Sequence, residues 1–295
     1  MIRLAIRVQR EQAELVLAEL LELAPSGVEE AEVAPDLVEY AVYGAPGELP
    51  ELPDLKAAAG GALVEISTSE LPDDWSERWK HFHRPVLVER PVDGGGEVPA
   101  LHIRPPWEAP SDRAGVCEIV IDPAQAFGTG AHATTRLCLE LLLELAVQST
   151  NQGAAERGPL LDVGTGSGVL AIAAAKLGYA PVRALDNEIE SVEAARENAL
   201  VNGVDLEVGH FDLRRDQLLW EEPPDSGVMI ANLLRPLLLD LARKLPGRPR
   251  DLIASGLLAH EVEEIVDAFG ARWGLRERAR RSGGEWAATW LSVCG

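Results

Sequence analysis

The chain has 295 residues, of which 46% are hydrophobic, and a formal net charge of −21. This length fits one full α/β domain with an appendage, and the apolar content is ample for packed cores. No run of eighteen apolar residues and no signal peptide is found, so a soluble cytoplasmic protein is predicted. The acid excess disfavours phosphate backbones and would attract a basic protein. Direct nucleic-acid binding is therefore not expected, although the excess is equally explained by solubility needs.

The three cysteines, Cys117, Cys138 and Cys294, lie far apart and show no paired spacing. Neither a disulfide framework nor a zinc site is supported, and no metal is expected. Cys138 falls on a helical apolar stripe, which indicates a small core residue.

Residues 1–68 are predicted to form a small N-terminal α+β domain. The order of elements is strand, helix, strand, strand, helix, strand, over 2–8, 11–23, 30–33, 37–42, 55–60 and 62–67. This order is typical of a ferredoxin-like fold, which by itself names no function.

Residues 69–111 are predicted to connect this domain to the rest of the chain. A short helix over 73–82 carries Trp75, Trp79 and Phe82 on one face, which indicates either a docking surface or ordinary packing under a linker. Extended segments at 86–88, 100–103 and 118–121 are expected to form an antiparallel flap at the entrance of the next domain.

Residues 112–295 are predicted to form a doubly wound α/β domain. A helix over 134–147 precedes strands at 159–164, 181–186, 205–208, 227–231 and 250–255, and these alternate with helices near 168–177, 189–202, 234–245 and 258–269. A hairpin of 272–280 and 286–293 closes the chain. An antiparallel hairpin on a parallel sheet favours a Rossmann-like methyltransferase sheet over a dinucleotide-binding sheet.

The run from Leu160 to Leu170 is predicted to be a buried strand, a glycine turn and a helix start. Gly164 and Gly166 let the backbone approach a ligand closely, and Gly168 allows the following helix to pack on the strand. Asp186 ends the next short apolar run, where a carboxylate can accept hydrogen bonds from ribose hydroxyls. These features predict a nucleotide-type cofactor site.

The glycine spacing favours S-adenosylmethionine over a dinucleotide. Dinucleotide sites use Gly-x-Gly-x-x-Gly to place a helix terminus at a pyrophosphate, whereas here Val169 occupies the third glycine position. Asp162, at the head of the turn, can reach the ammonium group of S-adenosylmethionine. A dinucleotide enzyme and a glycine turn used only for packing remain the alternatives.

A second unusual stretch, from Asp122 to Thr135, has two glycines, an exposed Phe and a Thr pair before a helix, as expected of a lid over a planar ligand. This stretch resembles the signature of the PrmA family, the methyltransferases of large-subunit ribosomal protein eleven. The resemblance runs nearly the whole length: Ala126–Gly130, His132, Thr134-Thr135, Asp74-Trp75 to Lys80, Pro105-Pro106-Trp107, Asp162–Gly168, Asn198–Gly203, Asn232-Leu233-Leu234 and Glu285-Trp286.

The resemblance implies a protein N-methyltransferase that takes S-adenosylmethionine as its cofactor and a basic ribosomal protein as its substrate. Residues 1–68 would recognise the substrate, and residues 112–295 would catalyse, in an enzyme expected to be a monomer without membrane contact. The alternatives are the same catalytic domain acting on another protein or a small amine, and a non-catalytic scaffold for ribosome or partner binding.

The family pattern also assigns the site residues. It places cofactor contacts on Thr135, Gly164, Asp186 and Asn232, with Phe127 over the adenosyl end. Each assignment has a plainer alternative: Thr135 could cap its helix, and Asp186 could be a turn acid. His132 is either catalytic or a hydrogen-bonded loop residue.

Asn232 is the predicted catalytic residue. Methyl transfer is an in-line displacement that needs a neutral amine aligned with the methyl group, and enzymes of this type act mainly by positioning. The side-chain carbonyl of Asn232 can accept a hydrogen bond from the amine and aim its lone pair. Three features depart from the family pattern: Thr165, Ala133 and the segment from Asn232 to Pro236, which is one residue shorter before the proline and places the charged Arg235 beside the acceptor channel. Cofactor binding is expected to survive all three, but the altered segment puts the identity of the acceptor in doubt.

Overall fold

The computed structural model describes residues 2–13, 16, 20, 28–34, 36–44, 60–70, 83–89, 100–123, 132–151, 157–216 and 227–293. The chain divides into two compact units, Met1–Phe82 and His83–Gly295. Each unit has its own hydrophobic core, and each is described here by itself.

The first unit contains a four-stranded antiparallel sheet in the order β2-β3-β1-β4. The strands are β1 (Ile2–Gln9), β2 (Glu29–Ala34), β3 (Leu37–Gly44) and β4 (Leu63–Glu70), with short 3-10 turns η1 (Arg10–Gln12) and η2 (Gly60–Ala62). This strand order confirms the ferredoxin-like prediction. The predicted helix over 55–60 lies outside the described residues except for Gly60.

The sheet of the first unit has one apolar and one polar face, as strand alternation requires. Buried helical residues Val16 and Leu20 belong to the core on the apolar face, and the Tyr40 hydroxyl donates to the Ala13 carbonyl at 3.0 Å. On the polar face, Arg3 and Arg7 bind Glu39 at 2.6 and 2.7 Å. The hydrogen bond from Arg3 is the main cause of a lowered pKa at Glu39.

The second unit begins with a three-stranded sheet of β5 (Val86–Glu89), β6 (Ala100–Arg104) and β7 (Val116–Val120). β5 and β6 are antiparallel, as predicted, but β6 and β7 are parallel, so the expected all-antiparallel flap is wrong in its second pair. The difference arises because the chain over 105–115 crosses back before β7 starts. The connector helix predicted over 73–82 lies outside the described residues.

A seven-stranded sheet forms the centre of this unit, in the order β10-β9-β8-β11-β12-β14-β13. Its strands are β8 (Leu160–Val163), β9 (Val182–Asp186), β10 (Glu207–His210), β11 (Val228–Asn232), β12 (Asp251–Leu258), β13 (Leu275–Gly283) and β14 (Trp286–Val293). The helices are α4 (Ala133–Asn151), α5 (Val169–Lys176), α6 (Ile189–Asn202), α7 (Arg235–Lys244) and α8 (Val262–Trp273), with the 3-10 turn η4 (Ala259–Glu261).

Strand direction distinguishes this sheet from a uniformly parallel one. The strands from β10 to β12 are parallel, whereas β14 is antiparallel to both β12 and β13. One reversed strand therefore lies second from the edge, because the β13–β14 hairpin inserts its second strand beside β12. The predicted doubly wound, methyltransferase-type sheet is confirmed.

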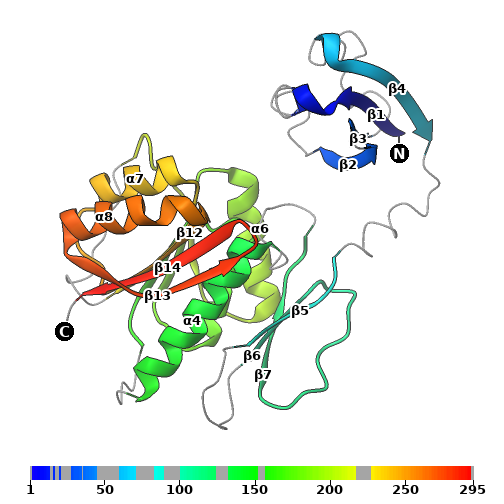
Figure 1. Cartoon of the computed structure of the whole chain (residues 1–295). Coiled ribbons are helices and arrows are strands. Elements are labelled where there is room, and N and C mark those ends of the chain that lie inside the picture. The colour runs from blue at the N-terminus through cyan, green and yellow to red at the C-terminus, as the bar shows by residue number, and fades with distance from the viewer. Residues whose placement is uncertain are drawn as a thin grey trace. The chain divides into compact units, whose positions relative to one another are not determined.

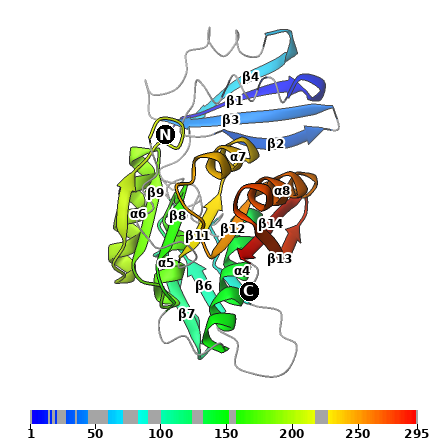
Figure 2. The ribbon, with the colours of Figure 1, turned by 90° about the vertical axis from the view of Figure 1, so that its left-hand side faces the viewer.

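Helices cover both faces of the seven-stranded sheet (Figures 1 and 2). α4 and α5 pack on one face in one apolar cluster, while α7 and α8 pack on the other face in a second cluster. Cys138 is fully buried in the first cluster, which confirms its predicted core role. Among the described helices, none is long and apolar enough to cross a membrane.

Candidate cofactor and acceptor site

The glycine turn lies at the carboxyl end of β8, at the centre of the sheet, where the strand order reverses and ligands bind in open α/β folds. Gly164, Gly166 and Gly168 all have left-handed φ angles, of 78°, 54° and 83°, which favour glycine. The backbone N–H groups of Gly164 and Thr165 both donate to the Leu185 carbonyl, at 2.8 and 3.0 Å. The turn is thus fixed to the end of β9.

Two of these glycines also permit close packing. A Cβ at Gly168 would lie 3.1 Å from the Cα and the Cβ of Ala195, so this glycine allows α6 to pack closely against the turn. A Cβ at Gly164 would lie 2.4 Å from Leu233 Cδ2. The glycine turn therefore touches the segment that follows Asn232.

Asp186 has two contacts with the backbone around it. Its Oδ2 accepts the Gly166 N–H at 2.8 Å, and its Oδ1 accepts the Glu188 N–H at 3.1 Å. The contact with Glu188 shows that Asp186 also stabilises the turn that follows it, which was the plainer alternative for this residue. Each oxygen keeps a further acceptor position, so the carboxylate can hold the turns and still receive ligand hydroxyls.

Asp162 lies in β8 and is completely buried. Its Oδ2 accepts a hydrogen bond from Thr165 at 2.7 Å, whereas its Oδ1 has no hydrogen-bond partner among the described residues. Burial raises the pKa of Asp162 to about 7, which the Thr165 hydrogen bond partly opposes and the nearby Asp186 charge increases. Asp162 is therefore a completely buried acid behind the glycine turn, and its burial disfavours the charged form.

Asp162→Asn should change the pH dependence of stability. Because the pKa of Asp162 is raised on folding, the native state binds this proton more tightly, and its stabilising effect is lost as pH rises from about 4 to about 7. The variant lacks this loss, so its unfolding free energy at pH 8 should exceed that of the unliganded wild type by about 2–4 kcal/mol.

Denaturant titration between pH 4 and pH 8 measures this difference. Asp251→Asn is the matched control, because Asp251 is a buried acid paired with Arg250 at 2.7 Å. Neutralising Asp251 should lower the unfolding free energy of the protein. A constant difference between Asp162→Asn and wild type over this range would contradict the raised pKa.

Asn232, the predicted catalytic residue, contacts the start of α4. Asn232 ends β11, and its Nδ2 donates to Thr134 Oγ1 at 3.3 Å and to Thr135 Oγ1 at 3.5 Å. Thr135 is the third residue of α4 and therefore does not cap it. Thr134 Oγ1 also lies 2.8 Å from His132 Nδ1, and the His132 ring meets Trp286 edge-on.

The chain after Asn232 is held tightly against β12. Gly256 has a φ of 82°, and a Cβ there would lie 2.4 Å from the Leu233 carbonyl oxygen. Arg235, expected beside an acceptor channel, instead forms ion pairs with Glu261 at 3.1 Å and Glu264 at 2.7 Å. Its charge is thus neutralised by acids at the start of α8.

A cavity of about 200 Å³ lies beside the glycine turn. It is lined by residues at or just after the carboxyl ends of β8, β9, β10 and β11, together with one residue of α7: Val163, Gly164, Leu185, Asp186, Asn187, Phe211, Asp212, Leu213, Arg214, Leu233 and Leu237. The residues after β10, from Phe211 to Arg214, are not among the residues predicted for the site. Their position directly after the third parallel strand is the signal that could have located them, because carboxyl ends of parallel strands share one edge.

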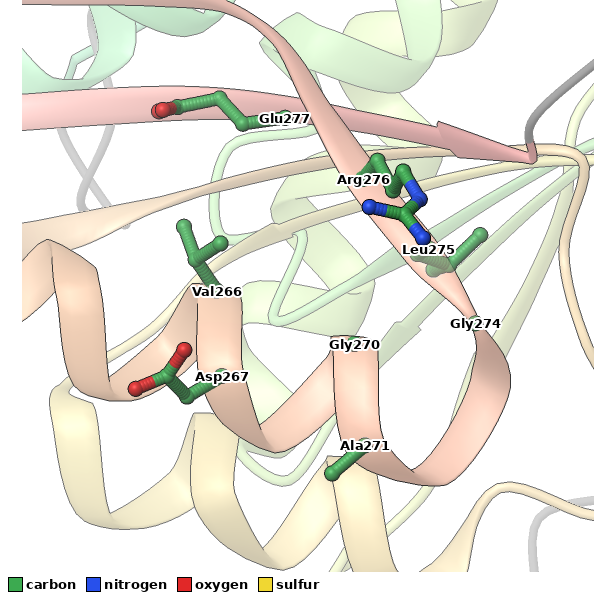
Figure 3. Close-up of a pocket in the computed structure, with 8 residues that line it drawn as sticks. All are labelled: Val266, Asp267, Gly270, Ala271, Gly274, Leu275, Arg276 and Glu277. Atoms are coloured by element: carbon green, nitrogen blue, oxygen red, sulfur yellow. The ribbon is translucent and has the colours of Figure 1, made fainter.

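A larger groove, of about 680 Å³, lies between α8 and the start of β13 (Figure 3). It contains none of the predicted site residues. The charged side chains of Asp267, Arg276 and Glu277 point in different directions there and do not converge on a common point. We therefore assign the site to the smaller cavity at the carboxyl ends of the strands.

The segment that leads into the predicted lid, residues 120–122, is hydrogen-bonded close to the glycine turn. Phe127 itself lies outside the described residues, but the preceding segment is held by α6. Asn198 donates to the Ser167 carbonyl at 2.9 Å and accepts the Asp122 N–H at 3.0 Å. Asn202 accepts the Val120 N–H at 2.9 Å and donates to the Val120 carbonyl at 2.6 Å.

The described residues fit S-adenosylmethionine. Gly164 and Gly166 provide a close backbone approach, and Asp186 keeps acceptor capacity for hydroxyls. Asp162, predicted to reach the ammonium group, is completely buried and is not among the residues that line the cavity. Within the described ranges, no group of three or more His, Cys, Asp or Glu residues could hold a metal ion.

The fold and the site together define a Rossmann-like methyltransferase. More particularly, residues 52–292 match the family described as ribosomal protein L11 methyltransferase (PrmA). The chain belongs to this family.

Similar proteins agree with this assignment. A ribosomal protein L11 methyltransferase of Myxococcus xanthus is 36% identical over 76% of this chain and 70% of its own length. Another, of Pseudomonas paraeruginosa, is 36% identical over 83% of this chain and 75% of its own length. A crystal structure of the ribosomal protein L11 methylase of Lactobacillus delbrueckii superposes with a TM-score of 0.52, at 28% identity, covering 70% of this chain and 98% of that one.

The match does not extend over the whole of every relative. The L11 methyltransferase of Symbiobacterium thermophilum is 36% identical over 73% of this chain, but this chain spans only 64% of that protein.

Proposed function

We propose that this protein transfers methyl groups from S-adenosylmethionine to amino groups of ribosomal protein L11, either lysine side chains or the N-terminal amine. The observation that carries the proposal is the packing of the Asn232 segment on the glycine turn. Leu233 lines the same cavity as Gly164 and Asp186, so a cofactor held there would lie next to Asn232, the residue predicted to aim the amine.

S-adenosylmethionine supplies the methyl group as an electrophile when it is bound. Asp186 and the glycine turn would hold its ribose and amino-acid portions, with Thr135 and Phe127 as the further contacts that the family pattern implies. Asn232 would accept a hydrogen bond from the amine and align its lone pair with the methyl group. A lysine amine with a pKa of about 10.4 costs about 4–5 kcal/mol to deprotonate at pH 7, and an α-amine about 1 kcal/mol.

Substrate recognition is assigned to the N-terminal domain. Residues 1–68 contain 13 acidic and 4 basic residues, and this negative charge would attract a basic ribosomal protein. In this scheme residues 69–111 connect the domain to the catalytic part, residues 112–295, and the enzyme acts in the cytoplasm as a monomer without binding nucleic acid directly.

Mass spectrometry of ribosomal protein L11 after incubation with the enzyme and isotope-labelled S-adenosylmethionine tests this function. Labelled methyl groups on L11 amines are expected. Labelling of another protein or of small amines, with L11 unmodified, would support the alternative substrate classes. Cofactor binding without transfer to any amine would leave only a scaffold role.

Asp186→Ala should weaken binding of S-adenosylmethionine by about 1–3 kcal/mol, because ligand hydroxyls would lose their acceptor. Isothermal titration calorimetry measures this change, with NAD as a negative control for the wild type because Val169 replaces the third dinucleotide glycine. Asp186 also accepts the Glu188 N–H, so the variant could lose stability as well as cofactor affinity. Thermal unfolding without cofactor measures the loss of stability separately. An unchanged dissociation constant would show that the ribose is held elsewhere.

A further inference from the structure

Three polar side chains, those of His132, Thr134 and Asn232, form a continuous hydrogen-bonded chain. His132 Nδ1 lies 2.8 Å from Thr134 Oγ1, and Thr134 Oγ1 lies 3.3 Å from Asn232 Nδ2. Thr134 is almost fully buried, with 1% of its surface exposed. A buried hydroxyl between two polar groups can donate to only one of them and must accept from the other.

The direction of these hydrogen bonds can be deduced. The backbone N–H of Thr134 also points at His132 Nδ1, at 3.4 Å. Because a backbone N–H can only donate, Nδ1 is the acceptor of this contact and carries no proton. The Thr134 hydroxyl therefore donates to His132, and its oxygen is left to accept from the Asn232 amide.

This direction fixes the orientation of the amide. With its proton committed to His132, Thr134 Oγ1 can face only the NH₂ group of Asn232, since an amide oxygen there would oppose another acceptor. Thr135 Oγ1, 3.5 Å from the same Nδ2, lies on the same side. The amide oxygen Oδ1 then points away from the threonines, and no described residue donates to it.

We propose that His132 and Thr134 are positioning residues, which hold the Asn232 amide with its oxygen directed to the incoming amine. The inference rests on the proposed role of Asn232 as the residue that aims the amine. In this arrangement His132 does not remove the substrate proton. Its Nδ1 is occupied by Thr134, and its ring packs edge-on against Trp286 with centroids 5.2 Å apart.

The orientation can be measured without turnover. Long-range ¹⁵N correlation spectra of the full-length protein should show His132 as the neutral tautomer with its proton on Nε2. The side-chain NH₂ resonance of Asn232 should move in Thr134→Val, where the acceptor is lost, and stay near its wild-type position in Thr134→Ser. A proton on Nδ1, or an Asn232 resonance indifferent to Thr134→Val, would overturn the proposal.

Kinetics test the consequence of the orientation. Thr134→Val should lower kcat for L11 by about 10- to 100-fold, with the cofactor dissociation constant nearly unchanged, because misaligned reacting groups slow the chemical step. Thr134→Ser should recover most of that loss. Thr289→Val is the matched control, because it removes another buried hydroxyl, whose hydrogen bond goes to Glu277 at 2.9 Å and not to His132, Thr134 or Asn232. It should leave kcat as in wild type.

Two variants of His132 separate positioning from proton transfer. His132→Asn keeps an acceptor oxygen near the place of Nδ1 but has no basic nitrogen, and it should retain much more activity than His132→Leu. Equal losses in both would assign a proton-transfer role to His132 and overturn the proposal. If the wild type binds cofactor but does not methylate L11, the proposed function fails, while the NMR measurement still decides the amide orientation.

Discussion

Asn232→Ala should lower kcat for methylation of L11 by about 10²- to 10³-fold while weakening cofactor binding only slightly. The reason is that aiming the amine matters in the transition state and not in the cofactor complex. The structure supports this separation, because the Asn232 amide contacts Thr134 and Thr135 and is not itself among the residues that line the cavity. Single-turnover kinetics and calorimetry measure the two quantities independently.

Asn232→Asp is the companion variant for this prediction. It keeps the size and an acceptor oxygen but loses the NH₂ donor to Thr134, so an intermediate loss of kcat is expected. Equal losses of turnover and cofactor affinity in Asn232→Ala would instead make this residue a cofactor ligand only.

Removal of residues 1–82 should lower kcat/KM for L11 by about 10²- to 10⁴-fold, because a tethered recognition domain raises the effective concentration of the amine at the site. The cut follows the division between the two compact units, and the described residues proposed to hold the cofactor, Thr135, Gly164 and Asp186, lie beyond it. Asn232, proposed to aim the amine, lies beyond it as well. Cofactor affinity of residues 83–295 should therefore equal that of the full chain.

Adding residues 1–82 as a separate chain is the control for this experiment. It restores the missing surface without the covalent tether, and at micromolar concentrations it should recover little of the lost rate. A truncated enzyme that methylates L11 as fast as the full chain would show that recognition lies within residues 83–295.

The strands of the large sheet could be predicted to within a few residues, because short apolar runs alternate with glycine, proline and acidic turns. Predictions failed where tertiary contacts decide the boundary. β12 continues to Leu258 past a register shift between Ala254 and Leu257, where Gly256 takes a left-handed φ. α8 begins later than predicted because Glu261 accepts the Leu258 N–H within a 3-10 turn.

The glycine turn and Asp186 could be identified because they are close in sequence and follow a known spacing. The hydrogen bond between Asn232 and Thr134 could not, since it joins residues 98 positions apart. The role of Gly256 is likewise a matter of packing, because only the structure shows the Leu233 backbone against it. Sequence patterns report local conformation, whereas these contacts depend on how α4, β11 and β12 meet.

The paired asparagines of α6 bear on how this protein unfolds. Asn202 satisfies both backbone groups of Val120 at the end of β7, much as a neighbouring strand would, and Asn198 joins the next turn to Ser167. β7 is thereby hydrogen-bonded to α6 as well as to β6, so the three-stranded sheet cannot separate from α6 without breaking these side-chain hydrogen bonds. We expect the amide protons of β6 and β7 to exchange with solvent through the same cooperative opening as those of α6.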